Sequence, residues 1–200
     1  MVNGVRSNSE WLGLSVDGVG GILRMAAMGR FVETDFSSRD TVGLARSLLG
    51  KYLVLEADGE NRAIAITEVE AYDGPEDLAC HASKGRTRRT ETLFGPPGHW
   101  YVYLCYGAHE MLNLVTGPVD YPAAILIRGL AEVSGPGRLT KRLGIDRRFN
   151  ARPLSENTGL WLEDRGLEYS DTEVEATPRI GVDYAGEDWA NRLYRFVLKP

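Results

Sequence analysis

The chain has 200 residues, 43% of them hydrophobic and 26% charged, with a formal net charge of −5 at pH 7. These values are typical of one soluble globular domain with its own core, and they exclude a fibrous or low-complexity chain. Two cysteines are too few for a disulfide framework and no metal-binding spacing accompanies them, so we expect a reduced, cytoplasmic setting without a bound metal.

The first 30 residues show little pattern. The segment 18–29 is weakly apolar, but it is too short and too rich in glycine to span a membrane, and no basic leader marks a signal peptide. We expect residues 1–30 to be a disordered or loosely attached extension, and residues 31–200 to form a single domain that does not associate with membranes.

Strands dominate the rest of the chain. Ser38 or Asp40 can cap a helix over 41–49, and a hairpin of 51–56 with 62–72 is expected around Asp58-Gly59. The further expected elements are a helical turn over 90–94, strands over 100–106, 111–116 and 123–130, a helix over 138–143, a loop and edge hairpin over 150–172, closing strands over 178–182 and 194–198, and a helical turn over 187–191.

This order of elements predicts an α+β fold. The strand over 123–130 is almost continuously apolar, which is typical of a central, buried strand. Few helices accompany many strands, so we expect a single domain built on a curved, mainly antiparallel β-sheet with flanking helices.

Two charged residues in apolar strands suggest a reactive site. Alternation places Glu68 and Glu70 on the same strand face as Ile64 and Ile66, where carboxylates are costly to bury without partners. Arg128 interrupts another apolar strand, so we expect it to meet Glu70 directly or through a water. Such a pair would keep Glu70 ionised as a general base that deprotonates water, whereas a buried ion pair without a catalytic role is the alternative.

Aromatic residues lie close to these charges in the sequence. Tyr72, His81 and Tyr103 could clamp a flat ring, with about 0.5–2 kcal/mol per ring if that ring is cationic, and ordinary core aromatics are the alternative. Tyr106 precedes Gly107 at a strand end, where it could fill the gap left by a base that leaves its stack. A tyrosine packed on a neighbouring strand is the alternative for Tyr106.

The positive charge is concentrated in the middle of the chain. Residues 81–150 hold 10 Lys and Arg against 5 Asp and Glu, whereas the remainder holds 13 against 23. This band is compatible with nucleic-acid binding, although solvated basic faces are the commoner explanation. Gly135–Gly137 could present N–H groups to a phosphate, or be only a turn. The basic residues are Lys84, Arg86, Arg88, Arg89, Arg138, Lys141, Arg142, Arg147 and Arg148.

Taken together, these motifs resemble the alkyladenine (3-methyladenine) DNA glycosylase family over roughly residues 31–199. Each motif is modest alone, but their ordered set is highly specific. The motifs are Glu68–Tyr72, Gly74–Asp77 with His81, Lys84–Thr90, Phe94–Gly98, Tyr101–Gly107, Leu112-Asn113, Ile127-Arg128, Gly135–Leu139, Thr177–Val182 and Ala185–Trp189.

The resemblance implies a base-excision-repair enzyme that flips a damaged purine out of double-stranded DNA and hydrolyses its N-glycosidic bond, leaving an abasic site. Glu70 would activate the attacking water, with Arg128 positioning that water or the carboxylate. The other implied residues are Tyr72, His81 and Tyr103 around the base, Asn113 beside it to exclude guanine, Tyr106 as a wedge in the duplex, and Arg86, Arg89, Gly135, Gly137, Arg138 and Lys141 along the DNA backbone.

The resemblance also implies a monomer without metal or organic cofactor, which associates with the bacterial nucleoid when it acts on DNA. The implied substrates are 3-methyladenine, 7-methylguanine and, as further candidates, hypoxanthine and ethenoadenine. No lysine in the motifs suits a Schiff base, which indicates a monofunctional enzyme. Arg88, Ala108 and Glu110 depart from the family pattern, and a carboxylate at Glu110 would weaken DNA affinity or narrow the substrate range.

Two other functions are compatible with the residues alone. A damaged-DNA binding protein would flip bases without cutting them, and substitution of Glu70 would change nothing. A nucleoside hydrolase would use the same carboxylate and aromatic residues on free nucleosides, although the basic band argues against it.

Overall fold

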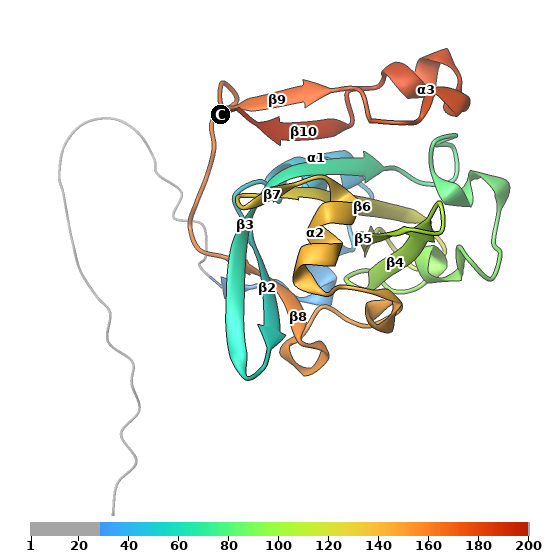
Figure 1. Ribbon diagram of the computed structural model, residues 1–200. Helices are drawn as coiled ribbons and strands as arrows, with labels where there is room; N and C mark the ends of the chain where they lie inside the picture. Colours follow the sequence, from blue (N-terminus) through green and yellow to red (C-terminus); the bar gives the residue numbers. More distant parts are fainter. Residues whose placement is uncertain (1–28, 200) are drawn as a thin grey trace, which may run out of the picture.

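The computed structural model describes residues 29–199, so the extension expected over residues 1–30 lies almost wholly outside the described part. A mainly antiparallel sheet with three α-helices forms the α+β fold that the sequence predicts (Figure 1). The helices are α1 (Thr41–Ser47), α2 (Pro136–Leu143) and α3 (Glu187–Asn191), and none between residues 29 and 199 is long and apolar enough to cross a bilayer.

All strand pairs between residues 29 and 199 are antiparallel, in the order β1-β8-β2-β3-β6-β5-β4. From this order β10 branches to pair with β3 and β9, and β7 pairs with β6. The strands are β1 (Gly29–Arg30), β2 (Tyr52–Ala57), β3 (Glu60–Tyr72), β4 (Trp100–Cys105), β5 (His109–Thr116), β6 (Ala123–Leu130), β7 (Val133–Ser134), β8 (Leu160–Asp164), β9 (Val174–Thr177) and β10 (Arg195–Leu198).

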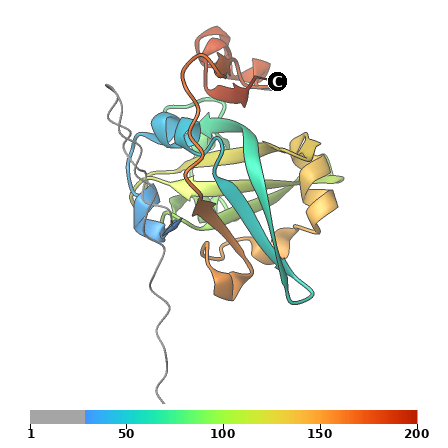
Figure 2. The ribbon, with the colours of Figure 1, turned by 90° about the vertical axis from the view of Figure 1, so that its left-hand side faces the viewer.

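The start of α1 and the turn between β2 and β3 are each set by residues that adjoin them in the sequence. Asp40 caps α1, because its Oδ1 accepts a hydrogen bond from the Gly43 N–H at 2.8 Å, although the helix ends two residues before the predicted Leu49. Asp58 and Gly59 turn between β2 and β3 with positive φ angles of 55° and 80°, as the sequence predicts. The resulting hairpin extends away from the body of the sheet (Figure 2).

A bulge interrupts the alternation of β3. The register against β6 shifts on both sides of Glu68, and Ile66 and Val69 both face the main core although they are three residues apart. The prediction that Glu68 and Glu70 share a face with Ile64 and Ile66 is therefore wrong. These two shifts in the pairing turn both carboxylates to the opposite face of the sheet.

The C-terminal third departs most from prediction. β8 lies between β1 and β2 inside the sheet rather than in an edge hairpin. The strand predicted over 178–182 is wrong: β9 ends at Thr177, since Pro178 has no N–H to donate and Gly181 adopts a φ of +75°. β10 and α3 form where the closing strand and the helical turn are predicted, and α2 ends at Leu143, as predicted, before Gly144 in the left-handed conformation.

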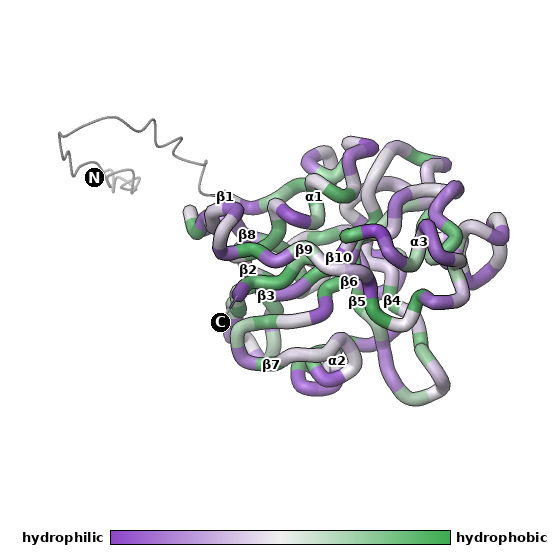
Figure 3. Tube along the Cα trace, turned by 90° about the horizontal axis from the view of Figure 1, so that it is seen from above, coloured by the Kyte–Doolittle hydropathy of each residue, from purple (hydrophilic) through white to green (hydrophobic). Residues whose placement is uncertain are grey.

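One face of the sheet holds the main apolar core, on which α1 and α2 pack. A smaller cluster on the other face, with Cys80, Leu93 and Tyr101 among its members, borders the site described below. In Figure 3 hydrophobic stretches run through the strands, whereas the α3 segment is largely hydrophilic. The two faces of the sheet thus differ in chemistry.

Candidate active site

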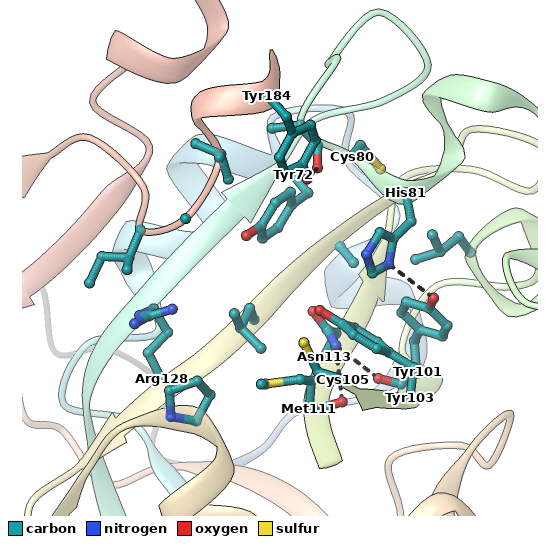
Figure 4. A pocket seen from close by; sticks show the side chains of 18 of the residues that line it. Tyr72, Cys80, His81, Tyr101, Tyr103, Cys105, Met111, Asn113, Arg128 and Tyr184 are labelled. Carbon is teal, nitrogen blue, oxygen red and sulfur yellow. Dashed lines mark hydrogen bonds between the residues drawn. The ribbon is translucent and has the colours of Figure 1, made fainter. Parts of the chain in front are cut away.

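A cavity of about 360 Å³ opens on the sheet face that lies away from the main core (Figure 4). Met111 and Asn113 of β5 line this cavity, whereas Leu112 between them is buried in the main core. Residues from β3, β6, the 79–81 segment, the β4–β5 hairpin and the 180–184 segment form most of the walls, and Leu93 and Pro136 complete them. The cavity volume lies in the range of small-molecule binding sites.

Glu70 is fully buried directly behind one wall of the cavity. Its Oε1 accepts a hydrogen bond from the Ile180 N–H at 2.8 Å, and its Oε2 accepts one from the Tyr72 hydroxyl at 2.9 Å. The Arg128 Nη1 lies 3.4 Å from Oε1. Because Tyr72, Arg128 and Ile180 line the cavity, the carboxylate is one side chain away from it.

The predicted meeting of Glu70 and Arg128 is confirmed, and a second carboxylate takes part in it. Glu68 Oε1 accepts hydrogen bonds from Arg128 Nε at 2.9 Å and from Arg195 Nε at 2.7 Å. Arg128 therefore bridges both carboxylates. Burial raises the pKa of Glu70 above its ordinary value, and the Arg128 charge is the strongest influence opposing this rise, followed by the Ile180 N–H.

The three predicted clamp residues border the same cavity. Figure 4 shows Tyr72 on one side, and His81 and Tyr103 on another. The His81 and Tyr103 rings meet edge to face with centroids 4.6 Å apart, and His81 Nδ1 lies 3.3 Å from the Tyr101 hydroxyl. Tyr101 was not predicted as a site residue, although alternation along β4 places it on the same face as Tyr103.

The aromatic wall is uncharged at neutral pH. Burial lowers the pKa of His81 to about 4, with a further contribution from the Arg89 charge, so its imidazole is neutral. Burial raises the pKa of Tyr101 to about 12 and also raises the pKa of Tyr103. Arg89, predicted as a DNA-backbone residue, lies with its Cζ 5.2 Å from the centroid of the Tyr103 ring.

Asn113 is buried where it lines the cavity (Figure 4). Its Nδ2 donates to the Tyr101 carbonyl at 3.0 Å and to the Met111 carbonyl at 3.2 Å. Both amide protons are thus used by the backbone, which fixes the orientation of the side chain and leaves Oδ1 as its remaining polar atom.

Tyr106 projects from the β4–β5 turn with 97% of its surface exposed, which contradicts the alternative that it packs on a neighbour. Its φ of +49° is rare for a bulky residue, and Gly107 follows with a φ of +69°. The Ala108 N–H closes the turn on the Cys105 carbonyl at 3.1 Å. The hairpin therefore holds an aromatic ring in solvent at the cost of backbone strain.

The predicted DNA-backbone residues fall into two groups. Arg86 already pairs with Asp120 and with Glu91, and its guanidinium stacks on Phe94. The others cluster at the start of α2, where Gly135 has a φ of +99° and Gly137 is so close to the β5 side chain His109 that a Cβ would lie 2.8 Å from it. On α2 itself, Arg138 and Lys141 are both exposed.

Sequence reasoning assigned no role to Arg179, which forms a fully buried ion pair with Asp77 beside the cavity. The only sequence signal was a charged residue within the Thr177–Val182 motif. Cys80 also lines the cavity, and burial raises the pKa of its thiol to about 12, which suits a packing residue. Across residues 29–199 we find no group of His, Cys, Asp and Glu side chains that could hold a metal ion.

Comparison with known proteins gives a consistent result. The family model described as Methylpurine-DNA glycosylase matches residues 35–135 and 131–200. Relatives named "Putative 3-methyladenine DNA glycosylase" occur in Legionella pneumophila strain Paris, 46% identical over 171 residues, and in Methanocella arvoryzae, 43% identical over 185 residues. A Myxococcus xanthus relative of the same name is 45% identical over 173 residues. Each match covers 82% of this chain, and 92%, 90% and 88% of the respective relative.

Proposed function

The chain belongs to the methylpurine-DNA glycosylase family and is thus a DNA repair glycosylase, and we propose that it flips alkylated purines from duplex DNA and hydrolyses their N-glycosidic bonds with a water activated by Glu70. The observation that carries this proposal is the buried Glu70 carboxylate directly behind an aromatic cavity of about 360 Å³. A cavity, a perturbed carboxylate and a cation beside it are the features of an acid–base site.

The hydrogen bonds of Glu70 support its role as the general base. A carboxylate offers about four acceptor sites, and the hydrogen bonds from the Ile180 N–H and the Tyr72 hydroxyl use two of them. Arg128 Nη1 lies 3.4 Å from Oε1 as an ion-pair partner, so acceptor capacity remains for a water. A raised pKa brings Glu70 closer to the pH at which proton transfer is most efficient, while Arg128 favours the ionised form that a base needs.

The cavity wall suits a cationic base. Tyr72 and Tyr103 offer ring faces or edges to a flat ring, and neutral His81 adds no repulsive charge. A purine made cationic by alkylation, such as 3-methyladenine or 7-methylguanine, is already a good leaving group. Asn113, held by two backbone carbonyls, cannot easily move aside for the exocyclic 2-amino group of guanine. Because 7-methylguanine carries the same amino group, it should be released more slowly than 3-methyladenine. Hypoxanthine and ethenoadenine, being neutral, would need protonation and should be slower substrates.

Tyr106 would occupy the gap in the duplex left by the flipped base. Its full exposure and strained φ support this role, since a strained, exposed aromatic ring contributes little to folding. Arg138 and Lys141, with the loop around Gly135, would hold phosphates beside the wedge. Arg86 would contribute only after release from its acidic partners, and Arg89 through the placement of Tyr103.

The carboxylate of Glu110 is less unfavourable for DNA binding than its sequence position suggests. Its Oε1 lies 3.1 Å from Arg147 Nε, and this pairing offsets its negative charge near the wedge. We therefore expect DNA affinity within the ordinary range for such enzymes. We also propose that the protein acts as a monomer and leaves an abasic site without strand cleavage.

The test is base release from duplexes that carry 3-methyladenine, 7-methylguanine, hypoxanthine or ethenoadenine. The wild type should release the alkylated bases, and Glu70→Gln should be slower by about 10²–10⁴-fold, because it keeps the shape of Glu70 but cannot accept a proton. Glu56→Gln on the exposed end of β2 is the matched control and should keep full activity.

Two outcomes would contradict the proposal. If the wild type bound damaged duplex but released no base, hydrolysis by Glu70 would be excluded for these substrates. If it released bases equally well from free nucleosides, recognition of duplex DNA by Tyr106 and α2 would be excluded.

A further inference from the structure

The ion pair between Asp77 and Arg179 lies behind the cavity wall, next to Tyr72 and Ile180, which line the cavity. Both side chains are fully buried, and Arg179 Nη2 donates to Asp77 Oδ1 at 2.9 Å while Nη1 donates to Oδ2. Such a two-pronged contact between a guanidinium and a carboxylate fixes both position and orientation. Neither residue belongs to the set that we assign to the reaction.

Each partner holds a different segment of the chain. The Asp77 carboxylate accepts the N–H groups of Asp73 and Ala79, both at 3.0 Å, and so shapes the loop that leads to the cavity. Arg179 donates to the Ala71 carbonyl of β3 at 2.9 Å and to the Trp189 carbonyl of α3 at 3.2 Å. The pair therefore ties the C-terminal segment to the strand that carries Glu70.

Arg179 also contacts the aromatic residues behind the cavity. Its Cζ lies 4.9 Å from the centroid of the Tyr72 ring and 5.2 Å from that of Tyr194. The next residue, Ile180, points its N–H at Glu70 Oε1 at 2.8 Å and lines the cavity. Both neutral donors to Glu70, the Tyr72 hydroxyl and the Ile180 N–H, thus depend on groups that Arg179 holds.

We propose that Arg179 and Asp77 are positioning residues, which hold the 178–184 segment and the Tyr72 ring so that two hydrogen-bond donors remain aimed at Glu70. This rests on the proposed role of Glu70 as the general base. Arg179 touches no reacting atom and acts only through Tyr72 and Ile180. A purely structural ion pair would stabilise the fold without changing the ionisation of Glu70 or its rate of proton transfer.

Removal of one partner alone would leave a buried, unpaired charge and risk unfolding. The test therefore replaces both, as Asp77→Leu with Arg179→Met, which removes the charges and keeps apolar volume. The matched control is Lys51→Met with Asp164→Leu, because that pair, 2.9 Å apart, is also largely buried but lines no part of the cavity. Arg179→Lys, which keeps the charge but loses the fork, should give an intermediate result.

The first readout is single-turnover base release as a function of pH. Glu70 is faced by Arg128 from β6, Tyr72 on β3, and Arg179 with the Ile180 N–H from the C-terminal segment, while Glu68 and Arg195 lie beyond Arg128. The Arg179 charge and the Ile180 N–H both favour the ionised form of Glu70. The double variant removes this charge, together with that of Asp77, which is not among the groups that face Glu70, and it also loosens the Ile180 donor. The pKa of Glu70 should rise further, so activity on the acid side should disappear at a higher pH than in the wild type.

The maximal rate of the double variant should also fall by about 10²-fold, which is the cost of small misplacements at a reacting centre. Its affinity for duplex DNA and its cooperative unfolding should persist. The control pair should keep the wild-type rate and pH profile. A double variant of Asp77 and Arg179 with the wild-type rate and pH profile would overturn the proposal.

The second readout does not depend on activity. Hydrogen exchange of the Ile180 amide should become faster in the double variant of Asp77 and Arg179, while exchange in the β2–β3 hairpin stays unchanged. If Glu70→Gln is inactive but the double variant behaves as the wild type, the positioning role of Asp77 and Arg179 is refuted and the proposed function stands. If the wild type releases no base, the proposed function fails. Unchanged exchange of the Ile180 amide in the double variant would refute the positioning role by itself.

Discussion

The two faces of the central sheet are formed by the same strands but bury different kinds of side chain. The core face is apolar and carries residues such as Leu112, Ile125 and Ile127, all fully buried. The cavity face buries carboxylates and guanidinium groups, which cost free energy unless every one is paired. This difference indicates that the core face supplies stability, whereas the polar burial of the cavity face is what the proposed chemistry of Glu70 requires.

The largest expected effect is on stability, and it should differ between Met111 and Leu112, which are consecutive residues on opposite faces of the sheet. Leu112→Ala should lower the free energy of unfolding by about 2–5 kcal/mol, because it leaves a void in a packed core. Met111→Ala should cost clearly less, because Met111 is only partly buried and borders an existing cavity, yet it should change base release. Urea unfolding and single-turnover assays would measure both variants. Equal losses of stability would show that the faces do not differ as we argue.

The same division explains what the sequence could predict. Caps and tight turns depend on neighbouring residues, so the Asp40 cap and the Asp58-Gly59 turn followed from local patterns. The bulge at Glu68 depends on how β3 meets β6, and no pattern within β3 signals it. Alternation alone therefore assigned the carboxylates to the wrong face, although it identified the strand and the residues correctly.

Contacts between distant segments could be predicted only where a charge in an apolar strand would be too costly to bury without a partner. A charge in each of two apolar strands required a partner, which led to Glu70 with Arg128. Arg179 follows a proline in a segment for which the sequence predicts a closing strand, and nothing in that segment indicates a buried partner. Its partner Asp77 is 102 positions away, so neither its burial nor its pairing could be read from local sequence.

The second prediction separates stability from function at the wedge. Tyr106→Asn should leave the free energy of unfolding unchanged or raise it by up to about 1 kcal/mol, because asparagine tolerates a φ of +49° better than tyrosine. Base release from duplex should nevertheless fall, while release from single-stranded DNA should fall less, since no stack has to be filled there. Chemical unfolding and both release assays would measure this, with Ala108→Gly as a control in the same turn. A clear loss of stability would mean that Tyr106 supports the fold.

The smallest expected effect is on how the stability of the protein changes as the pH falls below neutrality. His81 is held neutral by burial, with its pKa lowered from 6.5 to about 4, whereas in the unfolded chain it would titrate near 6.5. Between these values the unfolded state binds more protons, so the contribution of His81 to stability is present above pH 6.5 and is lost as the pH falls towards 4. The buried Glu70 acts in the opposite sense, because its raised pKa favours the protonated form in the fold and stability is lost as the pH rises through that pKa.

His81→Gln should therefore lose less stability than the wild type between pH 6.5 and pH 4, since it removes the histidine contribution and leaves the Glu70 contribution in place. Thermal or urea unfolding across this range would measure the difference. Identical slopes for wild type and His81→Gln would mean that the imidazole is not held neutral. A cationic purine would then meet a like charge in the cavity below pH 6.5, and the case for alkylated bases as the preferred substrates would weaken.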